Sequence, residues 1–155
     1  NSYGNNYRYY KIIDVFFFFF FHMKSFISLD EMKPGGQSAL YPSWLTNMYE
    51  VKEFIGRAEK MQSDQIRVGI VTLKHGANYP SHSHPAPEIY IQISGKVKWK
   101  VGGETRLISS ITAINIPSGT SHAMRNMGNI EAQLIYLWYA PDNDKSLLEE
   151  DAQLD

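Results

Sequence analysis

The strongest constraint on the fold is a period of two in the hydrophobic pattern, which begins after Ser63-Asp64. Five short segments carry this period: "QIRVGIVTL", "EIYIQIS", "KVKWKV", "TAINI" and "EAQLIYLWY". Clusters of turn-forming residues separate them, including "KHGANYP", "SGK", "VGGE" and "PSGTS". Successive side chains of a strand point to opposite faces, so this alternation predicts half-buried strands. Short strands at regular spacing predict an all-β sandwich or barrel.

The segment "KVKWKV" is the clearest of the five. Val97, Trp99 and Val101 fall on one face, while three lysines fall on the other. We interpret the lysine face as solvated, and its charge also discourages pairing at a sheet edge.

Composition limits the number of domains and the kinds of partner. The 155 residues are 43% apolar and 14% aromatic, which is enough for the core of one domain. Fifteen basic residues are balanced by sixteen acidic ones, so we expect neither nucleic acid nor membrane as a partner, and we expect a cytoplasmic protein. There is no cysteine, so a bound metal would need imidazole and oxygen ligands.

The first 22 residues differ from the rest, because they lack an initial methionine and include six consecutive phenylalanines. The apolar run 12–21 is interrupted by Asp14 and is about half of the roughly 20 residues that a spanning helix needs. Arg8 and Lys11 precede it as in a signal peptide, but no small-residue cleavage site follows. We expect 1–22 to be a disordered or non-native leader, with Met23 as the start of the working protein.

Residues 23–63 are predicted to be a helical and extended segment that packs on a β domain, which 64–155 form together with a C-terminal tail. "SLDE", from Ser28 to Glu31, has the capping-box pattern, and Pro34 limits the helix that it starts. Between Asn47 and Lys60, apolar residues recur at three- and four-residue spacings, which predicts one amphipathic helix.

Candidate ligands gather in "YPSHSHPAPEIY", residues 79–90. His82 and His84 point the same way in an extended chain, and Glu88 lies on the polar face of the next strand. An H-x-H pair alone is more often surface decoration, but a third imidazole, His122, follows in "IPSGTSHAMRN". Three imidazoles and a carboxylate suit one divalent transition metal with open positions, such as Fe, Mn, Co, Ni or Zn.

The spacing of these residues resembles the two signature motifs of the cupin superfamily. Gly76-x5-His82-x-His84-x3-Glu88-x6-Gly95 matches the first motif, and Pro117-x-Gly119-x2-His122-x3-Asn126 matches the second. The resemblance implies a double-stranded β-helix, or jelly-roll barrel, with a short N-terminal helical segment. One departure is Ile111-Thr112, where cupins usually have Gly-Asp in the turn before the second motif.

A narrower resemblance is to the cupin-type dimethylsulfoniopropionate (DMSP) lyases. It rests on Tyr79-x2-His82-x-His84-x3-Glu88-x-Tyr90, with "IRVGIVTLKHGANYP" before it and "SHAMRN" and "LIYLW" after it. The resemblance implies cleavage of DMSP to dimethyl sulfide and acrylate by removal of the α-proton and β-elimination. It also implies that Tyr90 is the base and that Tyr79 is a second active-site tyrosine.

The sulfonium of such a substrate suits an aromatic wall, through cation–π contact. Tyr136, Trp138 and Trp99 are our candidates for this wall, with ordinary core packing as the alternative. Two other functions stay open: an iron-dependent cupin dioxygenase, and a cupin that binds a small ligand without catalysis. A homodimer is possible through the isoleucine face of the Glu88 strand or through the predicted helix between Asn47 and Lys60.

Overall fold

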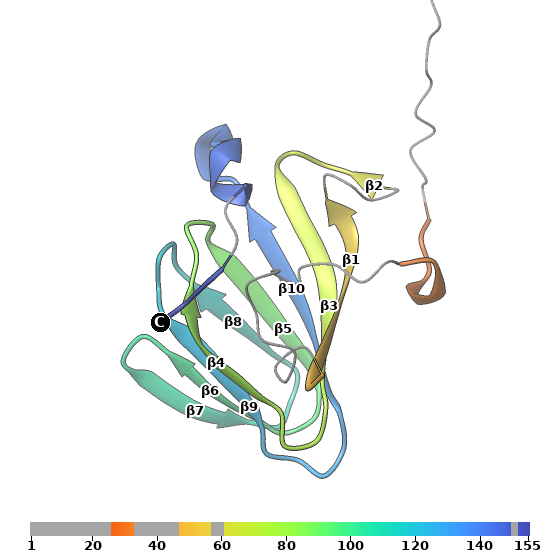
Figure 1. The fold of residues 1–155 in the computed structure, drawn as a ribbon, viewed down its shortest axis with the longest axis vertical. Coiled ribbons are helices and arrows are strands. Elements are labelled where there is room, and N and C mark those ends of the chain that lie inside the picture. The colour runs from red at the N-terminus through yellow and green to blue at the C-terminus, as the bar shows by residue number, and fades with distance from the viewer. Residues whose placement is uncertain (1–25, 33–46, 57–60, 150–151) are drawn as a thin grey trace, which may run out of the picture.

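The structure, a computed structural model, describes residues 26–32, 47–56, 61–149 and 152–155. Two β-sheets face each other (Figure 1). One sheet has the strand order β2-β1-β3-β10-β5-β8, and the other has the order β11-β4-β9-β6-β7. The bounds of these strands, in chain order, are β1 Tyr49–Gly56, β2 Met61–Gln62, β3 Ile66–Leu73, β4 Asn78–Ser83, β5 Glu88–Ser94, β6 Val97–Val101, β7 Glu104–Ile108, β8 Thr112–Ile116, β9 His122–Asn126, β10 Ala132–Tyr139 and β11 Gln153–Leu154.

The alternating pattern of the sequence determines which side chains enter the space between the sheets. Val97 and Trp99 of β6 are buried, and Lys98 and Lys100, which alternate with them, are exposed, as predicted. On β5 the polar residues Glu88 and Gln92 are buried, whereas Ile91 faces solvent. The interior therefore holds an apolar core and, on the same inner faces, a set of polar groups that need partners.

The predicted helix between Asn47 and Lys60 is wrong, because residues 49–56 form β1, antiparallel to β3. Tyr49, Val51 and Glu53 alternate inward along this strand, and all three are buried. The apolar spacing fitted a helix only because the inward carboxylate of Glu53 hid the period of two. Residues 49–56 form a strand because their backbone groups pair with the edge of β3. Residues 57–60 lie outside the described residues.

Several strands lie where none was listed from the sequence, among them β4, β7 and β9. β7 pairs with β6 through the "VGGE" turn. β4 begins inside "KHGANYP", which was predicted as a turn, because it pairs with β9 from Asn78 onward. Pro80 lies where the register shifts between Tyr79 and His82, so its missing N–H interrupts the ladder little.

The N-terminal expectations have different outcomes. Leu29–Glu31 forms the short 3-10 helix η1, and the Glu31 carboxylate accepts a hydrogen bond from the Ser28 backbone N–H at 3.1 Å, as the capping-box pattern predicted. The expected leader 1–22 lies outside the described residues, and the division at residue 63 stays a prediction. No helix in the described ranges is long and apolar enough to cross a membrane. After β10, the 3-10 helices η2 (Pro141–Asn143) and η3 (Lys145–Leu148) lead toward β11.

Candidate metal and active site

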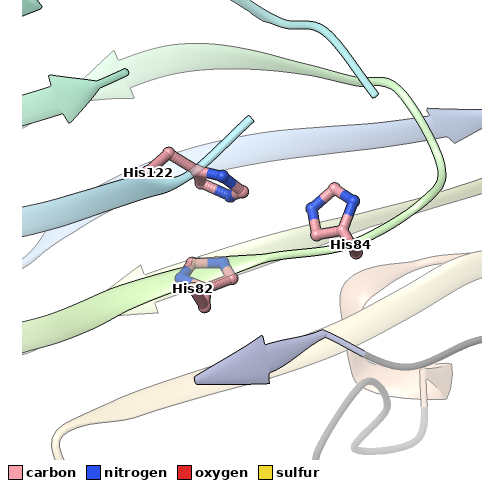
Figure 2. Close-up of side chains that lie close together, drawn as sticks. All are labelled: His82, His84 and His122. Carbon is pink, nitrogen blue, oxygen red and sulfur yellow. The ribbon is translucent and has the colours of Figure 1, made fainter. Parts of the chain in front are cut away.

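Three buried imidazoles converge at one end of the space between the sheets. His82 lies in β4, His84 follows β4 directly, and His122 begins β9. Pairing of β4 with β9 places His82 opposite His122 although forty residues separate them. One ligand nitrogen from each ring lies within 4.8 Å of the others. Figure 2 shows the three rings turned toward one another.

Backbone carbonyls determine which nitrogen each imidazole presents. The Nδ1 atom lies 3.0 Å from Pro80 O in His82, 2.7 Å from Ala86 O in His84, and 2.9 Å from Thr120 O in His122. A carbonyl only accepts, so each Nδ1 must carry the proton that it donates. In the neutral rings, each Nε2 therefore offers a lone pair, which is the arrangement that holds histidine ligands in metal sites.

Glu88, the first residue of β5, is the predicted fourth ligand, and this role stays a prediction. Its Oε2 lies 3.1 Å from His84 Nε2 and 3.3 Å from His122 Nε2. Its Oε1 accepts a hydrogen bond from the indole N–H of Trp138 at 2.7 Å. The carboxylate thus directs one oxygen toward the imidazoles and the other toward the indole.

The protonation of the site fits a metal. Burial, and then the neighbouring His122, lower the pKa of His82 to about 3. Burial alone would raise the pKa of Glu88, but His122 and His84 beside it outweigh burial and lower the pKa to about 2. Within the described residues, His122 Nε2 is buried with no hydrogen-bond partner. Three imidazoles and a carboxylate that converge in a buried site can hold a cation, and this donor set suits a divalent transition metal.

The two tyrosines expected to be catalytic lie on opposite sheets. Tyr79 of β4 packs edge-on against His82, with ring centroids 4.4 Å apart. Tyr90 lies two residues after Glu88 on β5 and is buried on the same inner face. Its ring centroid is 5.1 Å from that of Trp99. The catalytic roles of Tyr79 and Tyr90 stay predictions.

The three residues expected in the substrate wall all have partners within the protein. Trp99 is buried and donates its indole N–H to Gln92 Oε1 at 3.0 Å. Tyr136 donates its hydroxyl to Glu53 Oε2 at 2.9 Å. Trp138 contacts Glu88, and its ring stacks on that of His84 at 4.1 Å between centroids. Their role in substrate binding stays a prediction.

Sequence reasoning missed a polar cluster beside this site, formed by Glu53, Arg67 and Tyr136. Arg67 Nε and Nη2 lie 3.2 and 3.1 Å from Glu53 Oε2. Burial and the Glu53 carboxylate raise the pKa of Tyr136, so this phenol stays neutral and acts as a donor. The available sequence signal for this cluster was the alternation of Tyr49, Val51 and Glu53, which the prediction of a helix for this segment obscured.

The match to a known family covers the strands that carry the site. Residues 69–138 match the family described as "Cupin domain". Together with the two facing sheets, this match shows that the chain has the jelly-roll cupin fold.

The chain is also similar to individual proteins. The chain is 33% identical over 72 residues to the dimethylsulfoniopropionate lyase DddQ of Ruegeria pomeroyi, an alignment that covers 46% of this chain and 36% of that protein. The crystal structure of that lyase superimposes with a TM-score of 0.66 at 24% identity, over 79% of this chain and 59% of the other. A recombinant oxalate oxidase in complex with glycolate superimposes with a TM-score of 0.55 at 24% identity, over 70% and 56% of the two chains. At such identities the superpositions show the fold alone, and the chain spans only part of each relative.

Proposed function

We propose that the protein is a metal-dependent carbon-sulfur lyase that cleaves DMSP to dimethyl sulfide and acrylate. One observation carries the proposal. A buried site with four candidate ligands has a tyrosine, Tyr90, on the same inner face two residues beyond the ligand Glu88. The similarity to DddQ supports the choice of substrate.

The residues that would hold the metal are His82, His84, Glu88 and His122. When bound, a divalent cation supplies Lewis-acid stabilisation of the negative charge that develops beside the substrate carboxylate. The backbone carbonyls that hold each Nδ1 proton keep the imidazoles in the tautomer for binding. The low pKa of Glu88 keeps its carboxylate ionised at neutral pH.

Tyr90, as the phenolate that the bound cation would favour, would accept the α-proton of the substrate. The C–H electron pair becomes the double bond of acrylate, and the bond from the β-carbon to sulfur breaks with its electrons leaving on dimethyl sulfide. The reaction is an elimination, so it consumes no oxidant. Tyr136, beside Tyr90 in the strand register, is unsuited to be the base because the Glu53 carboxylate and burial keep it protonated.

The test is release of dimethyl sulfide and acrylate by purified protein loaded in turn with Fe, Mn, Co, Ni and Zn. We expect Tyr90→Phe to abolish product while metal binding stays intact. Tyr139→Phe is the matched control, because Tyr139 lies on β10 with the opposite alternation from Tyr136 and Trp138. No product with any metal that binds refutes the lyase, and an active Tyr90→Phe variant excludes Tyr90 as the base. Oxygen consumption without dimethyl sulfide would favour a dioxygenase instead.

A further inference from the structure

Trp138 touches two of the four candidate metal ligands without being a ligand. Its indole N–H donates to Glu88 Oε1 at 2.7 Å, and its ring stacks on that of His84 at an interplanar angle of 30°. The guanidinium carbon of Arg67 lies 5.1 Å from the centroid of the same indole. The ring is thus in contact with both the metal centre and the polar cluster.

The register of the sheet explains why these groups meet. Glu88, Trp138 and Arg67 are neighbours on β5, β10 and β3. In the next row, Tyr90, Tyr136, Gly69 and Glu53 follow one another from β5 to β1. Since Gly69 has no side chain, Tyr136 reaches across β3 to the Glu53 carboxylate, which also holds Arg67.

A buried ion pair beside an indole calls for an explanation, because burying two charges is costly and often adds no stability. Glu53 and Arg67 have side chains only 7% and 17% exposed. Their common effect is on Trp138: the carboxylate holds the guanidinium, and the guanidinium packs on the indole.

We propose that Trp138 is a positioning residue that makes Glu88 a one-oxygen metal ligand, and that the Glu53–Arg67 pair holds Trp138 in this position. The inference rests on the metal centre of the proposed function and not on its lyase activity. With Oε1 occupied by the indole N–H, only Oε2 is directed at the imidazoles. Loss of the indole N–H frees Oε1 to bind the metal as well, which would occupy a position that a substrate needs.

The test uses cobalt binding to the substrate-free full chain, measured by competition with a chelator. We expect Trp138→Phe to weaken Co²⁺ affinity roughly 10- to 100-fold, as is typical when a partner of a metal ligand is removed. The infrared difference spectrum of the carboxylate should change from a one-oxygen to a two-oxygen binding mode. Trp99→Phe is the matched control, because Trp99 is also a buried tryptophan with a hydrogen-bonded indole but contacts Gln92 instead of a ligand.

Arg67→Met keeps the experiment decisive if Trp138→Phe does not fold. We expect this variant to weaken Co²⁺ affinity in the same direction but by less, and to shift the carboxylate mode toward two oxygens. If a folded Trp138→Phe or Arg67→Met variant keeps the one-oxygen carboxylate mode, or binds Co²⁺ within about twofold of Trp99→Phe, the inference is wrong. A wild-type protein that binds Co²⁺ but releases no dimethyl sulfide with any metal that it binds refutes the proposed lyase and leaves this inference standing.

Discussion

Gly69 offers the sharpest test of how the polar cluster is built. A Cβ at this position would lie 2.5 Å from Tyr136 Cε1, 2.8 Å from its Cζ, and 2.4 Å from the backbone oxygen of Lys52. These distances are well inside van der Waals contact, so Gly69→Ala must displace the Tyr136 ring or separate β3 from β1. Either movement strains the Tyr136 hydrogen bond to Glu53.

The expected loss of stability follows from three contributions. Overpacking a well-filled interior costs about 1–3 kcal/mol. Loss of a hydrogen bond to a charged acceptor costs about 1.5–3 kcal/mol. The smaller conformational freedom of alanine in the unfolded chain offsets roughly 0.4–1 kcal/mol. We therefore expect Gly69→Ala to lower the free energy of unfolding by about 2–5 kcal/mol.

The assay is urea denaturation at 25 °C, comparing midpoints and checking that the slope m is unchanged. Gly103→Ala serves as the control, because a Cβ there meets no atom within 4 Å and the residue does not have a positive φ. We expect that variant to stay within about 0.5 kcal/mol of wild type or to be slightly stabilised. If Gly69→Ala also stays within that range, the contact between Tyr136 and Gly69 is wrong, and so is our account of the cluster.

Three further predictions concern other parts of the fold. Asn126→Asp should lower the free energy of unfolding by about 2–4 kcal/mol, measured by the same denaturation, because a buried carboxylate would replace an amide whose two N–H groups are shared among three backbone carbonyls. Hydrogen bonds from Ser121 and Ser81 lower the pKa of Asp155. Its ionised carboxylate therefore helps to hold β11 on β4 at pH values above the usual aspartate pKa, and this contribution is lost as the pH falls through the lowered pKa. Asp155→Asn should therefore speed amide exchange in β11 at neutral pH and remove the pH dependence of the protection of these amides. Unchanged exchange would contradict the role of Asp155 in holding β11 on β4. A metal ion at a free concentration of 100 times its Kd should raise the free energy of unfolding by about 2.7 kcal/mol, measured as a rise in Tm, and His122→Ala should abolish this rise.

The local sequence pattern predicted those strands whose side chains alternate strictly between the two faces of the sheet. "EIYIQIS" and "TAINI" coincide with β5 and β8, because strict alternation leaves no other structure that buries one face. β1 was mistaken for a helix because an inward charge interrupted its alternation, and the partners that make the charge acceptable are distant in sequence. Arg67 is 14 residues from Glu53, and Tyr136 is 83 residues away.

The sequence by itself determined the candidate ligand set, since the spacing of His82, His84 and Glu88 is local and the motif around His122 is recognisable without coordinates. Tertiary structure decided how the set is held. Pairing of β4 with β9 brings His122 opposite His82, and pairing of β10 with β5 and β3 places Trp138 between Glu88 and Arg67. The physical reason is that a hydrogen bond or a ring contact depends on distance in space, and only the order and register of the strands convert distant positions into neighbours.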